Sequence, residues 1–185
     1  MDFFIKTERL TLRQFQFEDA AALNAIANSE YVLTWMPDWK SDISDTENQI
    51  KWFISRYPPA TKTTALVAFA VEQNGELIGM AGIGNKAALD NELEVAYFIS
   101  ETHAGNGYAT EAVSAAAQWA FANLETDYLI VTVQTENQPS QRVADKCGFE
   151  KIDTRWLLDD GQTEEKLFYY YRLYNTARKK LICPE

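Results

Sequence analysis

Glu94-Val-Ala-Tyr-Phe-Ile-Ser100 has the composition of a strand, and the glycine-bearing turn Ala104-Gly-Asn-Gly-Tyr-Ala109 follows it closely. The turn leads into an alanine-rich segment, roughly Gly107 to Leu124, which predicts a long helix. The first amides of a helix have no partner within it, and its dipole is positive at that end. Gly105 and Gly107 would let an anion approach those amides. We therefore expect a phosphate-binding turn, although a lone Gly-x-Gly is also compatible with a simple helix cap.

The segments around this stretch predict a single sheet covered by helices. Asn74-Gly75 separates two apolar segments and is typical of a type I′ hairpin turn. Tyr128–Gln134 is apolar enough for a buried strand, and a helix from Gln138 to Cys147 should end at Gly148. Periodicity adds a strand at Arg9–Phe15, helices at Phe17–Ile26 and from Asp45, an aromatic loop at Tyr31–Trp39, and a hairpin of Lys151–Leu158 and Lys166–Tyr174 that turns at Asp159–Gly161. We expect one α/β (α+β) domain over residues 1–185.

Composition narrows the class of function. The formal charge of −10 disfavours a nucleic-acid or anionic-membrane surface and suits a cationic substrate or partner. One histidine and two cysteines, Cys147 and Cys183, without metal-type spacing predict no metal site. The chain has no apolar run of membrane-spanning length, and Met1–Lys6 lacks the profile of an export signal. We therefore expect a cytoplasmic protein.

Two blocks of sequence resemble the GNAT superfamily of acyl-CoA-dependent N-acetyltransferases. They are Glu94 to Ala112 and Asn137-Gln-Pro-Ser-Gln-Arg-Val-Ala-Asp-Lys-Cys-Gly-Phe149, in the family's order. The opening Thr7-Glu-Arg-Leu-Thr-Leu-Arg13 is most similar to the branch of ribosomal-protein N-terminal (alanine/serine) acetyltransferases. The resemblance implies a mixed, mostly antiparallel, splayed central sheet of about seven strands flanked by about four helices.

The resemblance also implies acetyl-CoA as the co-substrate. Backbone amides of the turn would hold the pyrophosphate, and the pantetheine arm would pair like a strand with the end of Glu94–Ser100. Asn137 matches the family residue that bonds this arm. The cofactor-binding residues expected on this basis are Phe98, Ile99, Ser100, Ala104, Gly105, Asn106, Gly107, Tyr108, Ala109, Thr110, Asn137 and Ser140.

Acetyl transfer requires a base to take a proton from the amine, and it benefits from an acid near the departing thiolate. Glu92 and Glu94 lie two residues apart, so they share a face of the strand and are both candidate bases. The resemblance favours Glu94; the alternative is that both are solvated strand residues. Many family members place a tyrosine as acid four residues before the Gly-Phe pair, where this chain has Ala144. The related branch instead uses a serine, which matches Ser140; the alternative for Ser140 is a helix-capping role.

The acceptor is the least specified part of the reaction. Loop aromatics such as Tyr31 and Trp35, together with Glu94, are candidates for binding a cationic acceptor. The resemblance favours the α-amino group of a protein N-terminus. A small amine (polyamine, aminosugar or amino acid) and a non-catalytic acyl-CoA-binding regulatory domain remain alternatives. The resemblance also allows a homodimer.

Overall fold

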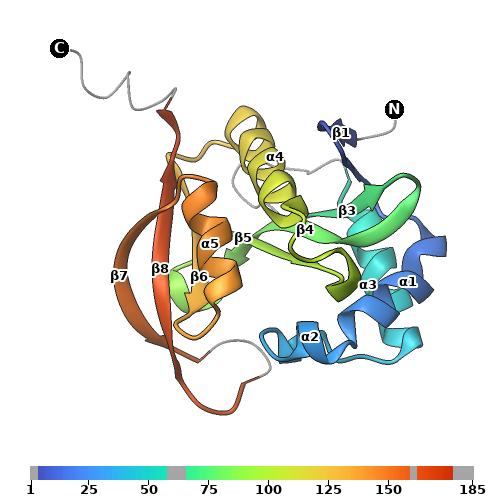
Figure 1. Ribbon diagram of the computed structural model, residues 1–185, viewed down its shortest axis with the longest axis horizontal. Helices are drawn as coiled ribbons and strands as arrows, with labels where there is room; N and C mark the ends of the chain where they lie inside the picture. Colours follow the sequence, from blue (N-terminus) through green and yellow to red (C-terminus); the bar gives the residue numbers. More distant parts are fainter. Residues whose placement is uncertain (1–3, 58–65, 159–161, 177–185) are drawn as a thin grey trace.

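The strands of the chain form one mixed sheet in the order β1-β2-β3-β4-β5-β6-β8-β7. The computed structural model describes residues 4–57, 66–158 and 162–176 (Figure 1). All pairs of neighbouring strands are antiparallel except β5 and β6, which are parallel. The strands are β1 (Phe4–Lys6), β2 (Thr11–Arg13), β3 (Val67–Gln73), β4 (Glu76–Lys86), β5 (Glu92–Ile99), β6 (Tyr128–Gln134), β7 (Glu150–Leu157) and β8 (Lys166–Tyr174).

Helices cover both faces of this sheet, as Figure 1 shows. On one face the alanines of α4 pack against the odd-numbered residues of β5 and β6, and α5 lies beside α4. On the other face α1 and α3 pack against alternate residues of β3 and β4, such as Ala70 and Met80. The helices are α1 (Ala20–Ala27), α2 (Glu30–Leu33), α3 (Ile43–Ser55), α4 (Tyr108–Asn123) and α5 (Gln138–Lys146).

The sheet divides between β5 and β6. These strands share a single paired position, Glu94 with Ile130, whereas β4 pairs with β5 along the whole length of β5. The two strands therefore diverge toward their ends at Ile99 and Gln134. An opening in the middle of a sheet exposes backbone groups of both strands, so it can receive an extended ligand.

Glycine and asparagine residues make the turns that the sequence predicts. Asn74 and Gly75 both have positive φ, as a type I′ turn requires, and they join β3 to β4. Gly148 follows α5 with a φ of 82°, which is the left-handed conformation of a helix C′ residue. These turns set the register of the hairpin and the end of the helix that carries Ser140.

The architecture agrees with the expected splayed α/β sheet and differs from it in detail. The sheet has eight strands rather than about seven, because Phe4–Lys6 pairs with β2 as an additional edge strand. Five α-helices are present in the described residues rather than about four. The extra one, α2, lies in the segment expected to be an aromatic loop; Ser29 caps it by accepting a hydrogen bond from the Val32 amide. The predicted turn at Asp159–Gly161 and Cys183 lie outside the described residues.

Candidate active site

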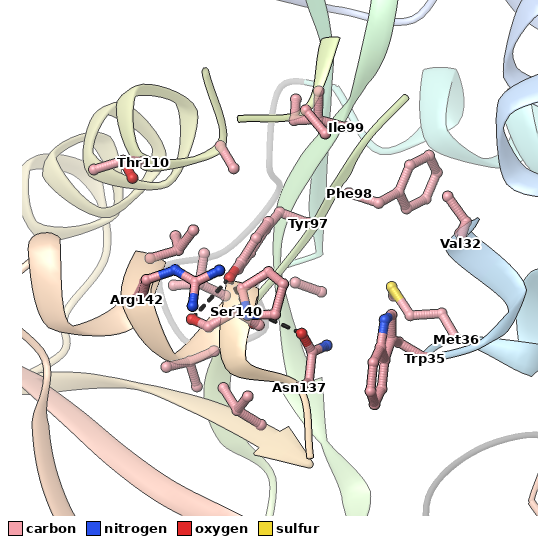
Figure 2. Close-up of a pocket in the computed structure, with 18 of the residues that line it drawn as sticks. Val32, Trp35, Met36, Tyr97, Phe98, Ile99, Thr110, Asn137, Ser140 and Arg142 are labelled. Atoms are coloured by element: carbon pink, nitrogen blue, oxygen red, sulfur yellow. Dashed lines mark hydrogen bonds between the residues drawn. The ribbon is translucent and has the colours of Figure 1, made fainter. Parts of the chain in front are cut away.

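A cavity of about 520 Å³ occupies the division between β5 and β6. The N-terminal turn of α4 and the first turns of α5 line one side of it, and α2 lines another, as Figure 2 shows. This volume is in the range of small-molecule and cofactor sites. Because side chains alternate along a strand, Tyr97 faces α5 while Glu94 and Phe98 face the opposite side of the sheet. The cavity therefore connects the two faces of the sheet.

The glycine turn lies at the cavity end of α4. Gly105 and Gly107 have φ values of 79° and 82°, which favour glycine. Gly107 is the N-cap of α4 and has no side chain to satisfy the helix amides, so the amides of Tyr108 to Thr110 have no acceptor within the helix. The turn and first helical turn line the cavity through Ala104, Gly105, Gly107, Tyr108, Ala109 and Thr110. This geometry can bind a phosphate or pyrophosphate through backbone amides.

Arg9 holds the turn from outside the cavity. Its Nη1 donates to the Asn106 carbonyl oxygen at 2.9 Å, and its Nη2 lies 2.7 Å from Glu111 Oε2. The guanidinium also lies over the Tyr108 ring, 4.8 Å from its centroid. Burial tends to raise the pKa of Glu111, but hydrogen bonds from Thr7 and Arg9 outweigh it and lower that pKa. The N-terminal segment is thus tied to the candidate phosphate-binding turn.

Ser140 lies in the first turn of α5 and faces the cavity, as Figure 2 shows. Asn137 caps α5 by accepting a hydrogen bond from the Ser140 amide at 3.1 Å. The Ser140 hydroxyl lies 2.6 Å from the Tyr97 hydroxyl. Ala144, one turn later, is buried in the core and has no hydroxyl group. Ser140 therefore provides the hydroxyl group of α5 that lines the cavity beside Tyr97.

Glu94 lines the cavity from the other face of the sheet. Its Oε1 accepts hydrogen bonds from the Thr132 hydroxyl and from the Thr132 amide, the latter at 3.2 Å. Lys86 Nζ lies 3.5 Å from Oε2, and both side chains are largely buried. A neighbouring ammonium group favours the ionised carboxylate. Glu94 can therefore accept a hydrogen bond from an amine in the cavity, directly or through water.

Glu92 shares the face of Glu94 but does not line the cavity. Its carboxylate accepts hydrogen bonds from the hydroxyls of Tyr128 and Tyr170, at 2.6 and 2.7 Å, and from Arg172 Nη2 at 3.0 Å. Burial tends to raise the pKa of Glu92, but these donors together lower it. These donors lie outside the cavity lining, and Glu92 is absent from that lining as well, so of the two candidates the structure brings only Glu94 to the cavity.

Aromatic side chains line the cavity on the same face of the sheet as Glu94. Trp35 and Met36 approach from the end of α2, and Trp39 packs edge-on against Phe98 with ring centroids 4.8 Å apart. Figure 2 places Trp35 and Met36 across the cavity from Asn137. Tyr31 also lines this side. An apolar wall beside a carboxylate can accept the amine and first side chain of an acceptor.

The cavity lining includes some of the remaining predicted residues and several that the sequence did not indicate. Ser100 and Asn106 do not line the cavity; the Ser100 amide is bonded to the Ile78 carbonyl, and the Asn106 side chain donates to the carbonyls of His103 and Ala104. Phe98 and Ile99 do line it. The lining residues that were not predicted include Asp38, Lys86, Tyr97, His103, Thr132, Arg142 and Lys146. The sequence could have indicated Arg142 and Lys146, because residues one helical turn apart lie on the same face of the predicted helix in the second block.

The described part of the chain contains no candidate metal site and no candidate membrane-spanning helix. Within residues 4–57, 66–158 and 162–176, no group of three or more histidine, cysteine or acidic side chains could hold a metal ion. No helix in that part of the chain is both long and apolar enough to cross a membrane.

Comparisons with known proteins agree with this geometry. The family model described as an acetyltransferase (GNAT) domain matches residues 9–150. The uncharacterized N-acetyltransferase YoaA of Bacillus subtilis (strain 168) is 29% identical over 183 residues, which cover 97% of each chain. A GNAT-family acetyltransferase structure from Bacillus anthracis is 27% identical with a TM-score of 0.75, over 94% of this chain and 99% of that one. A Vibrio cholerae structure described as a "putative ribosomal-protein-serine acetyltransferase" is 25% identical with a TM-score of 0.73, over 93% and 97% of the two chains.

The matched family segment contains the whole β5–turn–α4 unit and α5, which carry most of the cavity. The division of the sheet, the glycine turn at the start of α4 and the start of α5 at Gln138 thus all lie within the matched segment. The chain belongs to the GNAT family of acetyltransferases and is an acyl-CoA-dependent N-acetyltransferase.

Proposed function

We propose that this protein transfers the acetyl group of acetyl-CoA to the α-amino group of a protein N-terminus, by direct attack of the amine in a ternary complex. Acetyl-CoA would bind with its pyrophosphate on the amides of Gly105 to Thr110. Its pantetheine arm would lie in the division between β5 and β6, where Asn137 can bond it. Gly105, Thr110 and Asn137 all line the same cavity.

The observation that carries the proposal is the placement of Glu94 and Ser140 on opposite faces of the divided sheet. Glu94 belongs to the face of β5 that meets α2, whereas Ser140 lies on α5 against the other face. An amine entering beside Glu94 and a thioester entering beside α4 would therefore meet within the division. Glu94 would take the amine proton, directly or through water, and Ser140 would hydrogen-bond the departing sulfur.

Support for a protein N-terminus as acceptor comes from the similarity to the Vibrio cholerae structure and from the aromatic wall near Glu94. An N-terminal residue presents one ammonium group and one short side chain, which fits a carboxylate beside Trp35 and Met36. The net charge of −10 attracts basic partners at long range. Ribosomal proteins are an acceptor class of this kind.

A panel of acceptors tests the proposal directly. The purified protein would be incubated with acetyl-CoA and with peptides of varied first residue, and separately with polyamines, aminosugars and free amino acids, and products would be scored by mass. We expect transfer to free peptide N-termini and none to the same peptides with blocked N-termini. Transfer only to small amines would contradict the acceptor assignment. Tight CoA binding without any transfer would instead indicate a regulatory acyl-CoA-binding domain.

A further inference from the structure

Tyr97 makes a hydroxyl-to-hydroxyl contact with Ser140 across the cavity. Tyr97 lies on β5 and Ser140 on α5, and their oxygens are 2.6 Å apart; a dashed line marks this contact in Figure 2. Both residues line the cavity. A longer hydrogen bond, 3.4 Å, runs from the Tyr97 hydroxyl to the Ser140 carbonyl. The short contact joins β5 to α5, the helix that follows β6 in the chain.

Ala144 lies one helical turn after Ser140 on α5. Its side chain is buried and cannot donate a hydrogen bond, so Ser140 carries the only hydroxyl among the α5 residues that line the cavity, where Arg142 and Lys146 are the charged donors. A serine hydroxyl is both donor and acceptor, and its proton rotates toward whichever acceptor is available. Ser140 alone would therefore divide its time between several orientations.

We propose that Tyr97 is a positioning residue for acetyl transfer: its hydroxyl donates to Ser140 Oγ and so directs the Ser140 proton toward the sulfur of the bound acetyl-CoA. This inference rests on the proposed function. When the C–S bond breaks, its electron pair stays on sulfur, and the thiolate accepts the hydrogen bond from Ser140. The amine proton leaves through Glu94 or water. Tyr97 keeps its own proton throughout, and the thiolate is finally protonated by solvent.

The environment of Tyr97 supports a role as donor rather than acid. Burial raises the pKa of Tyr97 well above its usual range, with only partial compensation by the bond to Ser140. Because its pKa is raised, the Tyr97 phenol stays protonated at neutral pH. It therefore acts as a hydrogen-bond donor and not as an acid. With Tyr97 donating, one lone pair of Ser140 Oγ is engaged and the hydroxyl hydrogen is free to face the cavity.

The test compares Tyr97→Phe, Ser140→Ala and the double variant. A neutral hydrogen bond contributes about 1 kcal/mol, so Tyr97→Phe should lower kcat about three- to tenfold. The KM for acetyl-CoA should stay within about twofold, because the ring and the cavity wall are kept. Ser140→Ala should also lower kcat, and adding Tyr97→Phe to it should cause no further loss, since the hydroxyl that Tyr97 positions is gone.

Tyr171→Phe is the matched control. The Tyr171 hydroxyl is buried and has no hydrogen-bond partner among the described residues, and Tyr171 does not line the cavity. Its removal should leave kcat unchanged. Thermal melting of each variant would show that the fold is retained.

Three outcomes would overturn the inference: an unchanged kcat for Tyr97→Phe, a raised KM with normal kcat, or full additivity in the double variant. Thiol release from acetyl-CoA without acceptor would be measured in parallel, because it also requires departure of the thiolate. If the wild-type protein acetylates no amine but Tyr97→Phe slows this release, the proposed function fails while the role of Tyr97 stands. If the wild-type protein shows neither reaction, both are wrong.

Discussion

Two glutamates on the same face of one strand have different surroundings. Glu92 receives three donors from β6 and β8, whereas Glu94 has Thr132 on one oxygen and Lys86 near the other, and faces the cavity. The two residues have the same side chain and lie on the same face of β5. What differs is the set of partners: side chains of β6 and β8 surround the Glu92 carboxylate, whereas no β5–β6 pair follows Glu94, which lines the cavity.

We therefore expect Glu94→Gln to lower turnover at least tenfold at the optimal pH. The amide cannot accept the amine proton, and general-base catalysis typically contributes about 10²–10⁴ in rate. Glu92→Gln is the matched control, with the same chemical change two residues away on the same face. Its kcat should remain within about twofold of wild type at a temperature where it is folded. The reverse ranking in steady-state assays would assign the base to Glu92.

At the scale of elements, the β5–turn–α4 unit depends on a segment about a hundred residues earlier in the sequence. Arg9 joins the carbonyl of the turn to Glu111 in the first turn of α4, and Thr7 donates to the same carboxylate at 2.5 Å. Glu111 near a helix N-terminus is also favoured by the helix dipole. The turn is thus held in shape by contacts made on the side away from the cavity.

Arg9→Gln should weaken CoA binding two- to fivefold with little change in kcat. The Arg9 side chain is 43% exposed, and a pair of this exposure contributes up to about 1 kcal/mol. Calorimetric titration of CoA and the KM for acetyl-CoA would measure the effect.

Arg13→Gln is the control for loss of an N-terminal arginine. Arg13 pairs with Asp19 and Glu72, away from the turn, so its loss should lower the melting temperature and leave CoA affinity unchanged. Equal losses of affinity in both variants would show that general destabilisation, rather than the contact with the turn, is responsible.

At the scale of the whole molecule, the sheet has two parts, β1 to β5 and β6 with β8 and β7. The two parts are joined near Glu92 and Glu94 and separate toward Ile99. The Glu92 cluster provides this connection, since it links β5 to Tyr128 on β6 and to Tyr170 and Arg172 on β8. Only one residue pair joins β5 and β6 by strand pairing. Side-chain hydrogen bonds therefore supplement the sparse backbone pairing at the base of the cavity.

This connection predicts a pH-dependent stability. Glu92 has a lowered pKa in the folded state, so its contribution is present above the unfolded value of 4.5 and is lost as the pH falls through the folded pKa. Glu92→Gln should lower the free energy of unfolding by about 2 kcal/mol at pH 7, as expected for hydrogen bonds to a charged group. Denaturant titrations from pH 7 to pH 3.5 should show the difference from wild type shrinking below pH 4.5. A difference that is constant over this range would contradict the assignment.

Local patterns predicted much of the fold. Tyr128–Gln134 forms β6 with the expected bounds, Asn74-Gly75 makes the predicted turn, and α4 and α5 differ from their predicted bounds by one residue at most. These are segments where propensity, capping and burial agree. The segment around Tyr31 was predicted as a loop but contains α2, because the Ser29 cap and packing of Val32 into the core outweigh its irregular composition. The short β1 has too few residues to be recognised without its partner.

The candidate site was predicted less completely. Local sequence indicated the turn at Gly105 and Gly107 and the pair of glutamates, and resemblance added Asn137 and Ser140. Lys86, Tyr97 and Thr132 carry no such signal, because what places each of them in the site is a contact with another strand or helix.

The sequence by itself determined the strand–turn–helix unit, the alternation that puts Glu92 and Glu94 on one face, and the start of α5 at Gln138. These depend on short-range geometry: the positive φ of glycine, the two-residue period of a strand and the capping of a helix. Only the tertiary structure decided which glutamate reaches the cavity and which hydroxyl meets Ser140. Those outcomes depend on where β5 and β6 part, and that position is set by the packing of distant segments against both faces of the sheet.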